Sequence, residues 1–107
     1  MDKIIIELIV RNHPGVMSQI TGLFSRRAFN LEGILCAALT GTKESRMFLL
    51  VTKDERLPQI LKQLEKLYDV LCVTTHIGEE YLFYHELQSL WQRVEAAGPG
   101  INSAESA

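Results

Sequence analysis

R-N-H-P-G-V, at residues 11–16, decides the fold, because an apolar segment ends there and an amphipathic one begins. A strand that runs through Pro14-Gly15 directly into a helix leaves the first N–H groups of the helix unpaired, and the helix dipole adds partial positive charge. Such a helix start can seat a carboxylate or a phosphate. Asn12 can cap the first-turn amides or donate to a ligand, Pro14 fixes φ, and Gly15 lets a ligand approach the backbone closely. The alternative interpretation is an ordinary helix start without a ligand.

The segments on either side of this stretch have different periodicities. Residues 4–11 alternate between an apolar face and a half-polar face, which predicts a strand whose apolar face carries Ile4, Ile6, Leu8 and Val10. Residues 15–29 place apolar side chains every three or four positions, which predicts an amphipathic helix that ends near Phe29-Asn30. Gly22 lies inside this helix, where glycine costs about 1 kcal/mol relative to alanine, so we expect close packing against the sheet there.

The next elements follow in the same way. Two apolar runs, at residues 31–40 and 46–53, flank the turn-like segment G-T-K-E-S and predict a hairpin. A second amphipathic helix is expected to start between Asp54 and Leu57. Its apolar stripe comprises Leu57, Ile60, Leu61, Leu64, Leu67 and Tyr68. Residues 69–75 then predict a fourth strand.

The order β-α-β-β-α-β predicts an α+β fold of the ferredoxin-like type, a four-stranded antiparallel sheet with both helices on one face. In the usual strand order, 4-1-3-2, Cys36 and Cys72 lie on opposite edge strands, too far apart for a disulfide within one chain. The sequence contains no C-x-x-C motif and no Cys/His cluster at metal-ligand spacing. We therefore expect both cysteines to be small buried hydrophobes.

The C-terminal segment has a composition of its own. An apolar stripe along residues 79–97 predicts a further amphipathic helix, made by Phe83, Tyr84, Leu87, Leu90, Trp91 and Val94. Alone, such a helix would be marginal and would expose its aromatic side chains, so it must dock. We expect it to cover the half-apolar outer face of its own sheet, around Ile5 and Ile9, rather than to recruit a partner. Residues 1–78 are then one domain, and residues 98–107 a disordered tail.

Length, composition and charge disfavour several functional classes. The 107 residues, 47% of them hydrophobic, suffice for one domain. The 11 basic and 13 acidic residues are scattered, so no basic stripe is available for nucleic acid. The first apolar run is too short for a membrane span or a signal peptide, and we expect a cytoplasmic protein. The first strand lacks the aromatic residues of RNA-recognition modules, and the first loop lacks both paired cysteines and a glycine-rich phosphate cradle.

Two longer motifs resemble a known family. The small regulatory subunit of acetohydroxyacid synthase, also called acetolactate synthase, contains an ACT domain similar to I-I-I-E-L-I-V-R-N-H-P-G-V-M at residues 4–17 and G-L-F-S-R-R-A-F-N-L-E-G-I-L at residues 22–35. The likeness runs from about Ile4 to Thr75 and is best to the short small subunits with a single ACT domain. Residues 79–107 fall outside it.

The resemblance implies a non-catalytic chain that binds a branched-chain amino acid, usually valine, and imposes feedback inhibition on a separate catalytic large subunit. That subunit carries thiamine diphosphate, Mg²⁺ and FAD, and this chain is expected to carry no cofactor or metal. The small subunits pair side by side as a homodimer, with the effector between the first loop of one protomer and the end of the first helix and the second strand of the other. Carried over residue by residue, the first-loop side is Asn12, His13, Pro14, Gly15, Val16 and Met17, and the opposite side is Asn30, Leu31, Ile34 and Ala37.

Physical chemistry agrees with this implied site. The amides of Gly15 and Val16 suit an α-carboxylate, and the side-chain carbonyls of Asn12 or Asn30 can accept from the α-ammonium. An apolar slot for the aliphatic group would comprise Val16, Leu31 and Ile34. One methylene changes binding by only about 1 to 3 kcal/mol, so the choice among valine, leucine and isoleucine stays open.

Simpler roles also stay open for several residues. His13 is expected to shape the loop rather than act as a base, because no carboxylate or nucleophile partner lies at a fixed spacing. His76 and His85 read as surface or interface residues, and Arg26 and Arg27 as a solvated helix face or a contact with the catalytic subunit. Three other functions remain: a free-standing ACT sensor regulating another enzyme or a transcription factor, a small hydrolase, and a scaffold that recruits a partner.

Overall fold

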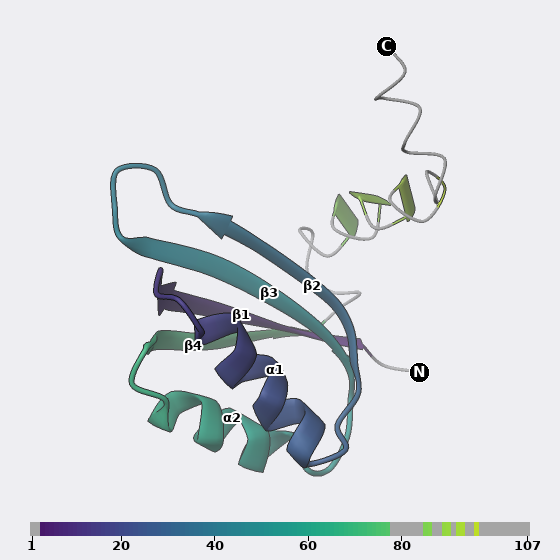
Figure 1. Cartoon of the computed structure of the whole chain (residues 1–107). Helices are drawn as coiled ribbons and strands as arrows, with labels where there is room; N and C mark the ends of the chain where they lie inside the picture. Colours follow the sequence, from purple (N-terminus) through teal and green to yellow (C-terminus); the bar gives the residue numbers. More distant parts are fainter. Residues whose placement is uncertain (1–2, 78–84, 87–88, 91, 94–95, 97–107) are drawn as a thin grey trace.

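The computed structural model describes residues 3–77 and, beyond them, residues 85–86, 89–90, 92–93 and 96. Its elements are β1 (Lys3–Arg11), α1 (Val16–Arg26), β2 (Leu31–Ala38), β3 (Glu44–Thr52), α2 (Leu57–Lys66) and β4 (Val70–Ile77). The strands pair antiparallel in the order β2-β3-β1-β4, and both helices cover one face of the sheet (Figure 1). The predicted βαββαβ fold and its strand order are therefore confirmed.

The hydrophobic core lies between the sheet and the two helices. β1 contributes the four apolar side chains predicted from its alternation, Ile4, Ile6, Leu8 and Val10, none of them more than 6% exposed. The helices and β3 supply most of the rest, namely Val16, Ile20, Leu23, Phe24, Met47, Leu49, Val51, Leu57, Ile60 and Leu64. Because β1 is a central strand paired on both sides, the loop that follows it starts from a fixed position.

The outer face of β1 combines apolar and charged groups. Ile5 is fully buried on this face. Glu7 lies 2.7 Å from the Nε2 of His76 and 3.3 Å from the Nε of Arg46. The predicted C-terminal helix and tail, residues 79–107, fall mostly outside the described residues, so their docking on this face stays a prediction.

Helix α1 ends at Arg26, before the predicted end at Phe29-Asn30. Ala28 adopts a φ of 52°, and the N–H of Phe29 donates to the carbonyl of Phe24 at 2.9 Å. This hydrogen bond and the left-handed residue form a Schellman motif. The rings of Phe29 and Phe24 also pack edge-on, with centroids 5.7 Å apart. This aromatic contact fixes the helix end, so Ala28 takes the left-handed conformation that we expected of Asn30.

Replacing Ala28 by glycine should raise the free energy of unfolding by about 1 kcal/mol, because the left-handed conformation strains an alanine and not a glycine. The N–H of residue 28 would still donate to the Ser25 carbonyl, as it does at 3.0 Å. Urea denaturation measures the change. As a control, Ala38→Gly in the exposed part of β2 should lower stability. A lower midpoint for Ala28→Gly would contradict the assigned helix end.

Three local predictions are wrong. Outside the backbone of its own helix, the described residues place only the guanidinium of Arg26 within 4 Å of a Cβ at Gly22, at 3.5 Å, so no contact with the described sheet requires glycine there. Tyr68 is 80% exposed because α2 ends before it. Cys36 and Cys72 lie on opposite edge strands as predicted, but both thiols are free and both residues are exposed, since edge strands are only partly covered.

Candidate functional site

The first loop, residues 12–15, connects the central strand β1 to α1 at one end of the sheet (Figure 1). Neighbours on both sides hold its start. The N–H of Asn12 donates to the carbonyl of Lys43, and the N–H of Arg11 donates to the carbonyl of Asp69, each at 2.8 Å. The loop is therefore anchored between the β2–β3 turn and the α2–β4 turn, while its own residues are exposed.

The start of α1 is open. Gly15 is the N-cap, with a φ of 90°, and none of the described side chains caps the helix. The first turn contains no acidic residue. The N–H of Val16 donates to the carbonyl of His13 at 3.2 Å. Among the residues that the structure describes, a Cβ at Gly15 would meet nothing within 4 Å, so a ligand has room to approach the backbone. An uncapped and accessible helix start favours an anion, which supports the predicted carboxylate seat.

A cavity of about 420 Å³ opens beside the first loop. Its wall carries both signs of charge and comprises Arg11, Asn12, His13, Lys43, Glu44 and Leu71. Among the residues predicted for the site, Asn12 and His13 line this cavity, whereas Gly15, Val16 and Met17 do not. Val16 is only 9% exposed and belongs to the core, while Met17 is 38% exposed. Met17 is therefore the apolar side chain that the helix start offers to a ligand.

Asp69 lies behind the first loop and was absent from the predicted site. The residue is 4% exposed, its Oδ2 lies 3.5 Å from the Nδ1 of His13, and its Oδ1 has no hydrogen-bond partner among the described residues. His13 therefore has a carboxylate neighbour that no fixed spacing in the sequence revealed, and its expected role in shaping the loop stays a prediction. Nothing in the local sequence marks Asp69 as buried, because an acidic residue between a helix and an apolar strand is ordinary turn composition.

The predicted opposite wall lies far from the first loop of the same chain. Figure 1 shows α1 running from the first loop to the other end of the sheet, and its 11 residues span about 16 Å. Asn30 is exposed there, and Leu31 packs against the core. Ile34 is 37% exposed on the helix-covered face of the edge strand β2. Ala37 lies on the opposite face, so its side chain cannot share a wall with Ile34.

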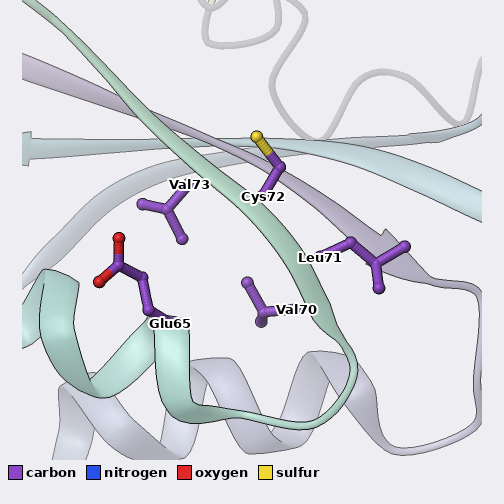
Figure 2. A pocket seen from close by; sticks show the side chains of 5 residues that line it. All are labelled: Glu65, Val70, Leu71, Cys72 and Val73. Atoms are coloured by element: carbon purple, nitrogen blue, oxygen red, sulfur yellow. The ribbon is translucent and has the colours of Figure 1, made fainter.

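Two other cavities are less suited to a ligand at the first loop. The first offers few polar groups, and the second lies at the far end of α1. One, of about 220 Å³, lies between α2 and the edge strand β4. Figure 2 shows Val70 and Val73 facing Glu65 across this cavity, whereas the thiol of Cys72 points to the other side of the strand. The other, of about 210 Å³, lies where α1 connects to β2 and is lined mainly by charged and polar side chains around Phe29.

The described part of the chain gathers no three His, Cys, Asp or Glu side chains where they could share a metal ion. Within the same residues, no helix is long and apolar enough to cross a membrane. The groups that the structure offers at the first loop are backbone amides, the amide side chain of Asn12 and the His13–Asp69 pair, all of which can contact a small polar ligand.

Glu32, on the wall of the 210 Å³ cavity, links three strands. Its carboxylate accepts hydrogen bonds from the Nζ of Lys3 on β1 and the Oγ1 of Thr52 on β3, and these bonds, that of Lys3 first, hold its pKa below the ordinary value. A carboxyl group whose pKa is lowered by folding stabilises the fold above its unfolded pKa of about 4.3, and this stability is lost as the pH falls through the folded pKa.

Between about pH 6 and pH 3, the melting temperature of the wild type should therefore fall further than that of Glu32→Gln. The difference should be small, because the carboxylate is partly exposed and screened by solvent. Scanning calorimetry at several pH values measures both slopes. Equal slopes would mean that these hydrogen bonds contribute no pH-dependent stability.

Comparison with known proteins identifies the family of this chain. A family model described as the AHAS small subunit-like ACT domain matches residues 6–72. The small subunit of Escherichia coli K12 acetolactate synthase isozyme 1 is 49% identical over 82 residues, which cover 77% of this chain and 85% of that protein. The small subunit of isozyme 3 from the same strain is 35% identical over 97 residues, 90% of this chain but 58% of that protein. A match of 97 residues includes part of the segment after Ile77, so the likeness extends past the predicted limit at Thr75.

Solved structures agree with this assignment. The acetolactate synthase small subunit from Thermotoga maritima superposes with a TM-score of 0.63 at 34% identity, over 70% of this chain and 47% of that one. The regulatory subunit of aspartate kinase from Thermus thermophilus, at 20% identity and a TM-score of 0.60, shares the fold alone. The chain spans about half the length of the longer relatives and most of the short isozyme 1 subunit. The chain therefore belongs to the ACT domains of acetohydroxyacid synthase small subunits.

Proposed function

We propose that this chain is a non-catalytic regulatory subunit that binds a branched-chain amino acid, with valine as the first candidate, and relays feedback inhibition to an acetolactate synthase large subunit. Family membership supports the regulatory role. The observation that carries the proposed ligand is the open helix start at Gly15, which has no capping side chain, no acidic neighbour in the first turn and free space above it.

An amino acid fits this helix start through its carboxylate. The first-turn amides of α1 can donate to the carboxylate, and each charge-assisted hydrogen bond contributes about 1.5 to 3 kcal/mol. Met17, which is 38% exposed, can contact the aliphatic side chain of the ligand. The side chain of Val16 is buried, and its N–H already donates to the carbonyl of His13 at 3.2 Å, so the carboxylate would accept from the amides that follow Val16 in the first turn. This division of roles replaces the apolar slot that the sequence placed at Val16.

The second wall of the site comes from another copy of the chain, since Asn30 and Ile34 lie a helix length away from the first loop within one copy. β2 is an edge strand of composition L-E-G-I-L-C-A-A, and its exposed residues include Ile34, Cys36 and Ala38. Apolar edges with one charge are prone to pair with another strand. A side-by-side homodimer through β2 would cover this edge and bring Ile34 of one copy toward the first loop of the other.

The effector must favour one state of the assembly to regulate it. A coupling of about 1 to 3 kcal/mol between effector binding and the large subunit is typical of allosteric proteins. In this proposal thiamine diphosphate, Mg²⁺ and FAD belong to the large subunit, and the small subunit contributes no catalytic residue. We expect the assembly to work in the cytoplasm.

Titration calorimetry and thermal melting with valine, leucine and isoleucine test ligand binding by the purified chain. A ligand at about a hundred times its Kd stabilises the folded state by about 2.7 kcal/mol, so the melting temperature should rise by several degrees. Because a shared pocket links binding to dimerisation, valine should also increase the dimer fraction in sedimentation experiments. Absence of any response to millimolar concentrations of all three amino acids would refute the sensor proposal.

The large-subunit proposal needs its own experiment. Co-purification with a candidate synthase large subunit, followed by activity assays with and without valine, separates a synthase regulator from a free-standing ACT sensor. We expect a stable complex whose acetolactate synthesis falls on addition of valine. A chain that binds valine but never associates with a thiamine-dependent large subunit would instead be a free-standing sensor.

A further inference from the structure

Asp69 is a buried carboxylate that the described structure leaves incompletely paired. The residue is 4% exposed, and its Oδ1 has no hydrogen-bond partner among the described residues. A charged oxygen that is removed from water without a partner is costly, and native proteins rarely leave one in this state without a reason. A donor that reaches Oδ1 in a ligand-bound state would supply the missing interaction.

The side chains around Asp69 leave a place for such a donor. The guanidinium of Arg11 donates to the carbonyl of Tyr68 and lies 4.4 Å from the centre of the Tyr68 ring, so it is engaged elsewhere. The Nδ1 of His13 lies 3.5 Å from Oδ2, longer than the usual N–H···O distance of about 2.9 Å. The side chain of His13 is also 60% exposed, so it can move away without disturbing the core.

His13 connects Asp69 to the ligand site. It lines the 420 Å³ cavity and contacts Asp69, whereas Asp69 does not itself line that cavity. The carbonyl of His13 also accepts the hydrogen bond from Val16 at the start of α1. The exposed side chain of His13 therefore separates Asp69 from the cavity, and the short first loop separates it from the open helix start at Gly15.

We propose that Asp69 accepts the α-ammonium group of the effector, and that His13 covers this carboxylate until the effector binds. The inference rests on the proposed amino-acid sensor function and adds the acceptor for the positive end of the ligand. The helix start at Gly15 receives the α-carboxylate, and the ammonium group takes the place of the imidazole at Asp69. A carboxylate binds an ammonium group more strongly than a neutral amide carbonyl does, so Asp69 replaces Asn12 and Asn30 in that role.

The test compares two ligands and four variants of the full chain by titration calorimetry. Valine and 3-methylbutanoate share the same carbon skeleton and carboxylate, but only valine has the ammonium group. Asp69→Asn should lower the affinity for valine at least tenfold and change the affinity for 3-methylbutanoate less than twofold. The melting temperature of this variant should be unchanged or raised. Glu65→Gln, which removes an exposed carboxylate from a different cavity (Figure 2), should leave the affinity for valine unchanged.

The variant His13→Ala provides a second measurement, which does not require the Asp69→Asn variant to fold. If His13 only covers Asp69, its removal should leave valine binding equal or tighter, because the ligand no longer has to displace a side chain. A threefold or greater loss of valine affinity in His13→Ala would overturn the covering role.

Other results would overturn the role of Asp69 itself. If Asp69→Asn binds valine within twofold of the wild type, the inference is wrong while the sensor proposal stands. A large loss in Glu44→Gln without one in Asp69→Asn would make Glu44, on the cavity wall, the acceptor instead. If the wild type binds no branched-chain amino acid, both the sensor proposal and this inference fail.

Discussion

Ile34→Lys should convert the proposed dimer into monomers and abolish the response to valine, while the fold of each chain is retained. Ile34 is 37% exposed on the edge strand β2, so a lysine there leaves the core of its own chain intact. In a symmetric dimer both copies bring the new charge to the same interface, and like charges facing each other cost several kcal/mol. The dissociation constant of the dimer should rise roughly a hundredfold or more.

Sedimentation velocity and valine titration measure the two effects on the same sample. Thr75→Lys is a matched control, because Thr75 is exposed on the same face of the sheet but on the opposite edge strand, β4. This control should remain dimeric and responsive to valine. A dimer that survives Ile34→Lys, or one broken equally by Thr75→Lys, would show that β2 is not the pairing edge.

The parts of the fold that sequence predicted best are those in which one periodicity has one structural solution. The alternation along β1 is satisfied by burying Ile4, Ile6, Leu8 and Val10 against the helices on one side. The spacing along α2 similarly placed Leu57, Ile60 and Leu64 in the core, with Asp54 at the helix start, where its Oδ1 accepts from Arg56 N–H at 2.8 Å. Right-handed crossovers then left a single compact arrangement for the strands.

Sequence failed where the outcome depends on contacts between elements. The first helix was expected to end near Phe29-Asn30, but the edge-on contact of Phe29 with Phe24 accompanies an earlier end, with Ala28 in the left-handed region. Cys36 and Cys72 were expected to be buried because they occur in apolar runs. An apolar run on an edge strand is only half covered within one chain, and the sequence alone does not reveal which strands lie at the edges.

The candidate site divides in the same way. The helix start at Gly15 was predictable, since Pro-Gly between a strand and a helix fixes the local backbone. The role of Asp69 was not predictable, because it lies 56 positions from His13 in the sequence. The two residues come together only because β4 pairs with β1. The two faces of β2 were also indistinguishable in a run of apolar residues, and only the register with β3 separates Ile34 from Ala37.

Gly15→Asp should abolish valine binding while leaving the chain folded. At the N-cap, the new carboxylate can accept hydrogen bonds from the first-turn amides of α1 and so occupies the place proposed for the carboxylate of the effector. The capping gain of about 1 kcal/mol offsets much of the strain that a side chain suffers at a φ of 90°, so the melting temperature should change little. Binding, by contrast, should fall by more than a hundredfold, because one anion blocks and repels another.

Gly41→Asp separates this blocking from the effects of strain and charge. Gly41 has a comparable φ of 79°, and a Cβ there would also meet nothing within 4 Å, but it lies in the turn between β2 and β3 rather than at a helix start. It should therefore lose about 1 kcal/mol of stability, without a capping gain, and still bind valine. Calorimetric titration of both variants distinguishes the alternatives. Valine binding that survives in Gly15→Asp would place the effector carboxylate elsewhere, and equal losses in the two variants would attribute the effect to strain instead of to the anion seat.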